Sequence, residues 1–353
     1  MGGMERENIN TDFLYKEGTY VEAGTCVNEP SSITIVVGGE RLTLDDYVPR
    51  LFISSGAVKT QLSKFVDVGM SYTTVGNGTK VEGAGDDGAI ILEILIPTLT
   101  GIIKYNLNEN MSILGGIKHI TINKGLLLQS STRRVVESNK SETGFVYGTS
   151  YQNEDIRLRA EIFIEKSITI SDIPLNVQEV LDGGGLGEVE EGLLKIGIGD
   201  AITLKFQSEI MADTLLYGSI RNSKWKDSQM AVDATDFTIF GDSKSYTLGT
   251  QCIINEKVSV SITLVNDDPD IKWIRGVDEN NAQFRDVGHL SFFPIASSRT
   301  NSVTIGSEIR INDSIGLSIA GTYTHISDTT VSDGIVTSLT NPISFKAKIN
   351  YTF

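Results

Sequence analysis

Apolar and polar side chains alternate with a period of two in several segments of the chain. The clearest segments are residues 156–164, 201–210, 258–264, 314–323 and 343–353. A period of two with one apolar face predicts a β-strand whose two faces meet different surroundings. Glycine is frequent (35) and proline scarce (7), and short Val, Ile and Thr runs are separated by Asn, Asp, Gly and Ser. We therefore predict an all-β fold.

The connections between the predicted strands fall into two length classes. Short polar turns are predicted at residues 63–65, 108–110, 153–155, 212–213, 255–257 and 312–314. Long polar or glycine-rich loops are predicted at residues 76–89, 123–142, 167–199, 227–243 and 266–299. Because the two classes alternate, the short turns and both termini share one end. This pattern predicts a transmembrane up-and-down antiparallel β-barrel of about 14 strands. With no linker or repeat visible, we expect residues 1–353 to form a single domain.

The two faces of each strand then correspond to lipid and lumen. In hydrocarbon every backbone group needs a partner on a neighbouring strand, which a closed barrel supplies. In the last strand we expect lipid to meet Ile343, Phe345, Ile349 and Tyr351, and the lumen to meet Lys346, Lys348 and Asn350. Tyr351 and Phe353 match the aromatic end of outer-membrane barrels, which the barrel-assembly machinery recognises.

Other functional classes find little support in the composition. The formal charge is −15, and no basic cluster is interleaved with aromatic residues, so nucleic acid is not an expected partner. Cys26 and Cys252 have no metal-ligand spacing, and the histidines are unclustered. No nucleophile elbow or phosphate-binding lysine motif occurs. We expect no enzyme activity, no cofactor and no metal.

Two features bear on the compartment. The longest apolar run, residues 89–96, is interrupted by Glu93 and is far shorter than the ~20 residues of a membrane helix. The start, MGGMERENIN, lacks the basic and then apolar stretch of a secretory signal. An exported protein would have lost that signal by processing, so a soluble alternative stays open at this point.

Residues 201–225, AITLKFQSEIMADTLLYGSIRNSKW, resemble a hairpin of the FadL family of outer-membrane transporters for long-chain fatty acids and other hydrophobic compounds. Residues 18–30, GTYVEAGTCVNEP, are similar to the family's first strand, and residues 100–120 to its fourth and fifth strands. The resemblance implies a 14-stranded barrel whose N-terminal hatch plugs the lumen. The first strand begins early here, so we expect a reduced plug at residues 1–10.

The resemblance also implies a route for the ligand. Ligand enters an external groove formed by two long loops and leaves sideways where the third strand kinks. The groove candidates here are Leu126, Leu127, Leu128, Leu175, Val177, Val180, Leu181, Leu186, Leu193 and Leu194. The opening candidates are Gly76, Asn77 and Gly78. From the residues alone, the leucines could instead form a small lid core, and the glycines an ordinary hairpin tip.

We therefore expect a monomer in a bacterial-type outer membrane, surrounded by outer-membrane lipid, that passively transports long-chain fatty acids or similar hydrophobic molecules. Transfer from an apolar groove directly to lipid keeps each CH2 out of water, worth ~0.8 kcal/mol. The alternatives are a general porin for polar solutes and a soluble β-structural or adhesive protein.

Overall fold

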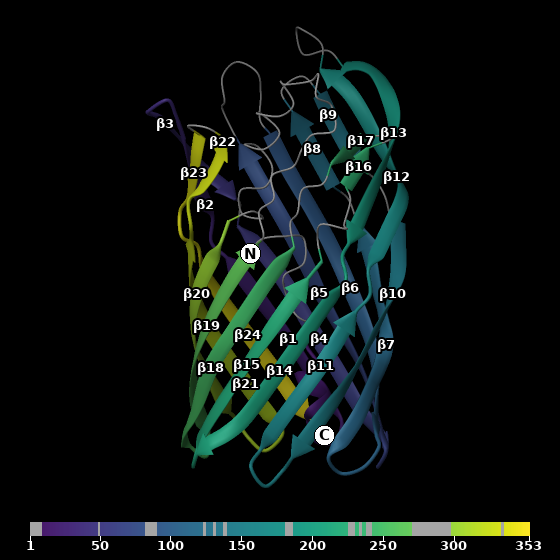
Figure 1. The fold of residues 1–353 in the computed structure, drawn as a ribbon, viewed down its shortest axis with the longest axis vertical. Helices are drawn as coiled ribbons and strands as arrows, with labels where there is room; N and C mark the ends of the chain where they lie inside the picture. The colour runs from purple at the N-terminus through teal and green to yellow at the C-terminus, as the bar shows by residue number, and fades with distance from the viewer. Residues whose placement is uncertain are drawn as a thin grey trace.

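The chain folds into a tall antiparallel barrel (Figure 1). The computed structural model describes residues 9–48, 50–81, 90–122, 125–129, 132–136, 140–180, 186–224, 230–232, 235–237, 242–269, 298–332 and 335–353. The barrel strands are β1 (Tyr20–Asn28), β4 (Leu51–Ser63), β5 (Val66–Val81), β6 (Ile90–Asn106), β7 (Met111–Ile122), β10 (Lys140–Asn153), β11 (Leu158–Glu165), β14 (Ala201–Met211), β15 (Thr214–Ser223), β18 (Ser243–Asn255), β19 (Val258–Pro269), β20 (Thr300–Arg310), β21 (Ile315–Ile326) and β24 (Ile343–Thr352).

The ring is closed by the first and last strands. β1 pairs with β24 from Tyr20↔Thr352 to Asn28↔Ser344, and on its other side β1 pairs with β4. Pairings β11–β14 and β15–β18 carry the ring past the hairpins inserted between those strands. The predicted all-β barrel of 14 antiparallel strands is thereby confirmed.

The short turns all lie at one end of the barrel, where β1 begins and β24 ends, as predicted (Figure 1). Asparagine shapes three of them in the same way. Asn108, Asn255 and Asn312 each accept hydrogen bonds through Oδ1 from the backbone N–H groups two and three residues later, at 2.8–3.0 Å. An Asn side chain that satisfies these amides stabilises a tight turn locally, which is why the sequence predicts these sites well.

The opposite end contains more strand than predicted. The prediction of irregular loops at residues 123–142 and 167–199 is wrong. They contain the hairpins β8 (Gly125–Gln129)–β9 (Thr132–Val136) and β12 (Ile168–Val180)–β13 (Leu186–Ile198). Likewise β5 runs to Val81 and β6 starts at Ile90, inside the loop predicted at 76–89. β8 pairs with β6, β9 with β12, and β13 with β16 (Met230–Val232), whose partner is β17 (Thr235–Phe237). The backbone hydrogen bonds of these strands are made to partners distant in sequence. The local sequence pattern does not reveal such partners.

A separate four-stranded sheet stands at the same end. It joins β2 (Ser31–Val37) and β3 (Glu40–Val48) to β22 (Thr329–Ser332) and β23 (Ile335–Leu339). Ile33, Tyr47, Val48, Ile326 and Leu339 form its buried core. Because β2 follows β1 and β23 precedes β24, the β2–β23 pairing continues the β1–β24 seam beyond the barrel.

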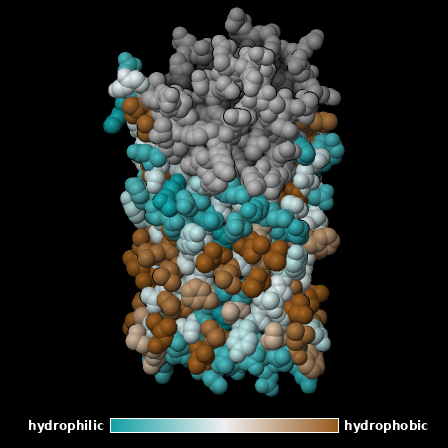
Figure 2. Space-filling model, viewed as in Figure 1, coloured by the Kyte–Doolittle hydropathy of each residue, from teal (hydrophilic) through white to brown (hydrophobic). Residues whose placement is uncertain are grey.

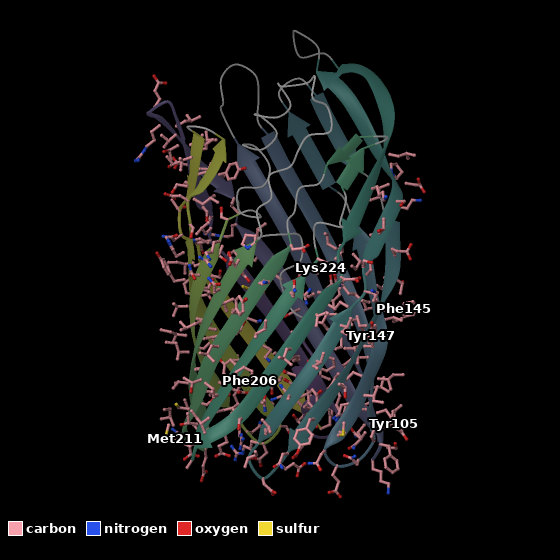
Figure 3. The ribbon with its side chains drawn as sticks, in the orientation of Figure 1. Tyr105, Phe145, Tyr147, Phe206, Met211 and Lys224 are labelled. Atoms are coloured by element: carbon pink, nitrogen blue, oxygen red, sulfur yellow. The ribbon has the colours of Figure 1, made fainter. Side chains whose placement is uncertain are left out.

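The wall has the two-solvent character predicted from the alternation. On the face shown in Figure 2, hydrophobic side chains form an apolar belt beneath a hydrophilic band. Tyr105 and Met211 mark its lower part near the turns, and Phe145 and Tyr147 lie further up (Figure 3). Ile343, Phe345, Ile349 and Tyr351 are exposed on the outer face, as predicted. Inward positions of the same wall include the buried charges Lys59, Lys104, Lys118, Glu161, Glu165 and Arg221.

Helix contributes little to the described part of the chain. Its one helical element is η1, a single 3-10 turn over Asp12–Tyr15. No helix among the described residues is long and apolar enough to cross a membrane.

The alternation predicts opposite effects for charge at two adjacent positions of β19. Ile262, 45% exposed on the outer face, changed to Arg places a charge in the belt and should lower the free energy of unfolding by about 2–4 kcal/mol. The control Ser261→Arg points into the lumen and should cost far less. Urea titration in lipid vesicles, read by heat-modifiable gel migration, measures both. Equal losses of unfolding free energy in the two variants would contradict the assignment of Ile262 to the outer face and Ser261 to the lumen.

Candidate functional site

The lumen holds the segment that precedes β1. Phe13 and Leu14 of η1 are buried against inward side chains of several strands. The cluster also contains Ile9, Tyr20, Ala57, Ile102, Leu114, Val146 and Phe163. Gly69 of β5 leaves room for it, since a Cβ there would collide with the side chains of Phe13 and Leu14. We call residues 9–18 the plug. It extends further along the chain than the predicted residues 1–10, of which 1–8 lie outside the described residues.

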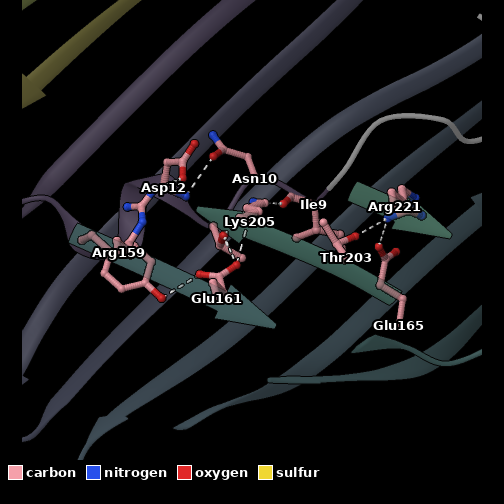
Figure 4. A network of polar contacts seen from close by, with 11 residues as sticks. Ile9, Asn10, Asp12, Arg159, Glu161, Glu165, Thr203, Lys205 and Arg221 are labelled. Carbon is pink, nitrogen blue, oxygen red and sulfur yellow. Dashed lines mark hydrogen bonds and ion pairs between the residues drawn. The ribbon is translucent and has the colours of Figure 1, made fainter. Parts of the chain in front are cut away.

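Charged wall residues bind the plug through specific hydrogen bonds (Figure 4). Glu161 of β11 accepts from Thr11 Oγ1 and from Tyr15 Oη, both at 2.6 Å. Lys205 of β14 donates to Ile9 O at 3.1 Å and to Thr11 Oγ1 at 2.8 Å. Arg159 pairs with Asp12. Burial, and next the charge of Glu161, raises the pKa of the Tyr15 phenol, so it stays protonated and keeps donating at neutral pH.

Opposite these contacts, a second charged group holds the end of the plug. Lys59 of β4 donates to Lys16 O at 2.8 Å and Gly18 O at 3.1 Å. Asp67 of β5 lies 2.9 Å from Lys59 Nζ and 3.3 Å from Lys104 Nζ. Lys104 also lies over the Tyr15 ring, 4.6 Å from its centroid. Each of these buried charges therefore has a partner, and the plug supplies some of them.

The entry to β1 adds a third contact. Glu22 accepts from Asn10 Nδ2 at 3.0 Å, from Tyr20 Oη at 2.8 Å, and from Lys348 of β24 at 2.9 Å. Higher in the lumen, Glu165 pairs with Lys118 at 3.0 Å and with Arg221. All three members of that cluster are buried. It joins β7, β11 and β15 on the same side of the lumen as the plug contacts of β11 and β14.

Two cavities border the plug. A cavity of about 820 Å³ opens at the turn end, and we call it the vestibule. Its lining mixes apolar side chains with charged and polar ones, among them Arg157, Glu209, Gln251, Glu308 and Arg310. A smaller cavity of about 110 Å³ lies beside Ile9 and Asn10, bordered by β1, β4, β5, β6 and β24. Lys16 of the plug lines the first cavity, and Ile9 and Asn10 line the second.

The wall loses its lateral pairing next to the smaller cavity. β4 and β5 pair from Ser63↔Val66 up to Ser55↔Thr73, and the described register goes no further. Above that point β4 pairs with β1, while β5 continues to Val81 paired with β6. At the point of separation Thr74 Oγ1 accepts from the Ser54 N–H at 2.9 Å. A side chain here replaces a strand-to-strand hydrogen bond.

The predicted opening residues lie on this separated stretch. Gly76, Asn77 and Gly78 pair only with Leu95, Ile94 and Glu93 of β6 in the described register. Their backbone is regular strand, so the hairpin tip considered from the sequence is wrong for these three residues. Whether they open the wall to ligand stays a prediction.

The predicted groove residues are brought together in one upper sheet. Leu126, Leu127 and Leu128 lie on β8, next to β9, and β9 pairs with β12, which carries Leu175 and Val177. Val180, Leu186, Leu193 and Leu194 lie on β12 or β13. Leu193 is exposed. Leu181 lies outside the described residues, and the groove stays a prediction.

Sequence reasoning missed the residues that hold the plug. Arg159, Glu161 and Lys205 lie in the alternating segments 156–164 and 201–210, but the alternation gives them no partner. The pattern that could have identified them is charge on inward positions of adjacent strands. In a plugged barrel, such charges need partners of opposite charge or hydrogen-bonding groups on the plug. His119 and His325 lie close to Thr143 and Asn341, and His289 is outside the described residues. No metal-binding group of three or more His, Cys, Asp or Glu is found among the described residues.

These features define a class: closed 14-stranded barrels with an apolar outer belt and a plugged lumen. Solved structures of that fold include the Pseudomonas putida toluene transporter TodX, at 10% identity and a TM-score of 0.73, covering 97% of this chain and 92% of that one. A Pseudomonas aeruginosa FadL homologue is similar at 11% identity and a TM-score of 0.69, with the same coverage of both chains. The Ralstonia pickettii toluene transporter TbuX is similar at 11% and 0.67, covering 96% and 90%. The resemblance to FadL-type barrels is confirmed for the fold.

Sequence comparison adds nothing to this likeness. No family model and no curated protein matches the chain. The relation therefore rests on the strand order and closure of the barrel.

Glu161→Ala should loosen the plug. It removes two hydrogen bonds to a charged acceptor, each worth roughly 1.5–3 kcal/mol, and leaves Lys205 without its carboxylate neighbour. Limited trypsin digestion in detergent should cut after Lys16 at least tenfold faster than in the wild type. Glu154→Ala, in the turn after β10, is the matched control, and trypsin should cut it at the wild-type rate. Equal protection in both variants would show that Glu161 does not hold the plug.

Proposed function

We propose that this protein sits in a bacterial outer membrane and passively transports hydrophobic small molecules of the long-chain fatty acid class or similar compounds. The proposal rests on the belt, the closed ring and the separation of β4 from β5. The fold-level likeness to structures described as toluene transporters and a FadL homologue agrees with this class of cargo. No covalent chemistry is required of any residue.

The separation of β4 from β5 carries the proposal. The separation lies at the level of the plug. Beneath it, the plug and its charged partners block the lumen. An apolar ligand that continued downward would meet the open vestibule with its charged side chains, at a cost of ~0.8 kcal/mol for each CH2 returned to water. A ligand that left between β4 and β5 would pass β3, which lies beside β5 without ladder pairing in the described register, and reach hydrocarbon without crossing water. The physical preference is therefore for lateral release beside Gly76, Asn77 and Gly78.

Entry from outside is assigned to the upper hairpins. Pairing of β9 with β12 joins the two leucine-bearing segments, and β8 connects them to β6, the neighbour of β5. An apolar groove on this sheet would lead along β6 toward the separated stretch of β5. The groove residues in this proposal are those named on β8, β12 and β13, together with Leu181.

The C-terminal aromatic pair is proposed to direct assembly of the barrel. Tyr351 and Phe353 stack edge to face with ring centroids 4.4 Å apart, and Phe353 is 74% exposed. The Phe353 N–H donates to Thr19 O, so the ring stands at the seam with β1. A recognition signal has to be accessible in this way before the barrel closes.

Phe353→Ala should lower the amount of folded protein in the outer membrane at least threefold, because the machinery loses its terminal aromatic contact. Phe345→Ala, on the same strand and also outward, is the control and should assemble nearly normally. Heat-modifiable migration of membrane fractions gives the folded amount. Equal assembly of both variants would remove this role from Phe353.

Bridging the separated strands should block transport. Extending the β4–β5 register would place Phe52 opposite Gly76. The test variant therefore carries Phe52→Cys and Gly76→Cys in a Cys26→Ser, Cys252→Ser background. Joining the two new cysteines by oxidation or with a short bis-thiol reagent closes the wall. Uptake of a labelled long-chain fatty acid, and of labelled toluene, should fall at least fivefold and recover on cleavage of the bridge.

The matched control is Val58→Cys with Met70→Cys, an outward pair where β4 and β5 are already joined. Bridging there should leave uptake unchanged. Undiminished uptake through the bridged upper pair would contradict lateral release at this place. A fall for one ligand alone would identify the cargo that uses the opening.

A further inference from the structure

A row of exposed charged side chains crosses the outer wall, where β11, β14, β15, β18, β19 and β20 reach the end opposite the turns. It consists of three ion pairs and one further lysine: Lys166–Asp200 at 2.7 Å, Lys224–Asp242 at 3.3 Å, Asp268–Arg299 at 3.0 Å, and Lys244, which lies opposite Asp268 in the strand register. We call these residues the charged row. Neither the plug nor the proposed route of the cargo uses them.

The charged row faces away from the lumen. Side chains two or four residues apart on a strand lie on the same face of the sheet. Lys244 and Asp268 therefore share a face with Tyr246 and Leu264, which are exposed on the outer wall. In the two ion pairs at the ends of the row, the side chains are 40–54% exposed. Hydrophilic side chains are also uncovered at this level in Figure 2.

The charged row lies where the apolar belt ends. Lys224 is above Phe145, Tyr147 and Phe206 of the outer wall in Figure 3. Tyr246, two residues along β18 from Lys244, is exposed, and so is Tyr147 of β10, beside the end of β11 that precedes Lys166. Exposed aromatic side chains flank the apolar band of outer-membrane barrels at the interface with the headgroups. The row is therefore at the height of the lipid headgroups, continuous with the surface that meets the acyl chains.

The charged row is net positive in an acidic protein. Four cations and three carboxylates give it a net charge of +1, while the whole chain carries −15. Lys244 makes no ion pair within the described part of the chain. The turns at the other end have the opposite balance, with six acids and three bases: Glu109, Glu154, Asp155, Asp213, Glu256 and Asp313 against Lys64, Arg157 and Lys257. The two membrane interfaces of the barrel thus differ in the sign of their charge.

The ion pairs of the charged row can exchange partners. Exposed pairs of this kind contribute little to stability, because water and salt screen both members. Lysine and arginine side chains form charge-assisted hydrogen bonds with phosphate oxygens, and grouped basic residues at a membrane surface attract anionic headgroups. A phosphate between Lys224 and Lys244 would meet two cations, of which only Lys224 has a carboxylate partner in the described structure.

We propose that the charged row docks the phosphate-bearing headgroups of membrane lipid in the leaflet at the end opposite the turns. The apolar side chains Leu248 and Leu264 lie opposite each other on β18 and β19 below the row, and both are exposed. A lipid whose acyl chains lie against them brings its headgroup to Lys244. A zwitterionic headgroup gains less, because its own ammonium group is repelled by the lysines. This role concerns the lipid around the barrel and is independent of the cargo.

The test compares spin-labelled phosphatidic acid with spin-labelled phosphatidylcholine around the purified full-length protein in phosphatidylcholine vesicles. Electron spin resonance separates lipid held at the protein from free lipid and so gives the relative association of the two headgroups. The wild type should prefer phosphatidic acid. Lys224→Gln with Lys244→Gln should lower this preference about fivefold or more, because two cations at the membrane surface are lost. The matched control, Lys64→Gln with Lys257→Gln, removes the same charge from the turn end and should keep the preference.

A variant of the opposite sign separates lipid binding from a structural role. Asp268→Asn breaks an ion pair but makes the charged row more positive, so the preference for phosphatidic acid should rise. Replacing sodium chloride by sodium phosphate at equal ionic strength should leave the preference in place, and its loss would assign the row to free phosphate and overturn the lipid assignment. No preference in the wild type, or equal preference in the wild type and in Lys224→Gln with Lys244→Gln, would also overturn it. Heat-modifiable gel migration shows that each variant is folded.

Discussion

The structure depends on one constraint: backbone hydrogen-bonding groups inside hydrocarbon need partners on neighbouring strands. The β1–β24 seam completes the ring of 14 strands, whose outward positions expose large hydrophobic side chains. Within the described register, β4 and β5 depart from this rule above Ser55↔Thr73. Thr74 satisfies the Ser54 amide there with its hydroxyl. The proposed lateral passage is placed here because a ligand between these strands would break the fewest strand-to-strand hydrogen bonds.

The lumen obeys a second constraint, that buried charges need counter-charges or hydrogen bonds. Lys59, Arg159, Glu161 and Lys205 meet it by binding the plug, which contributes carbonyls, hydroxyls and Asp12. The plug is thereby held from opposite sides of the lumen, by β4 on one side and by β11 and β14 on the other.

Much of the fold could be predicted because it is locally encoded. The two-residue alternation gives the facing of Ile343, Phe345 and Ile349, and Asn108, Asn255 and Asn312 set their turns with their own side chains. The hairpins within 123–142 and 167–199 were missed because their partners, such as β9 for β12, are distant in sequence. The binding of Tyr15 to Glu161 is equally non-local. For the same reason the sequence predicted a loop at residues 76–89, where β5 continues to Val81, and could not show that β4 leaves β5.

The central claim is that apolar cargo leaves through the wall between β4 and β5. It is tested most directly by mapping where a photoreactive long-chain fatty acid attaches to the protein in intact outer membranes, with adducts located by mass spectrometry. The account predicts adducts concentrated at residues 51–54 of β4 and 74–81 of β5, competed away by unlabelled fatty acid. Competed adducts on the vestibule side, at Gln251, Ser259 or Glu308, with none on β4 and β5, would contradict it.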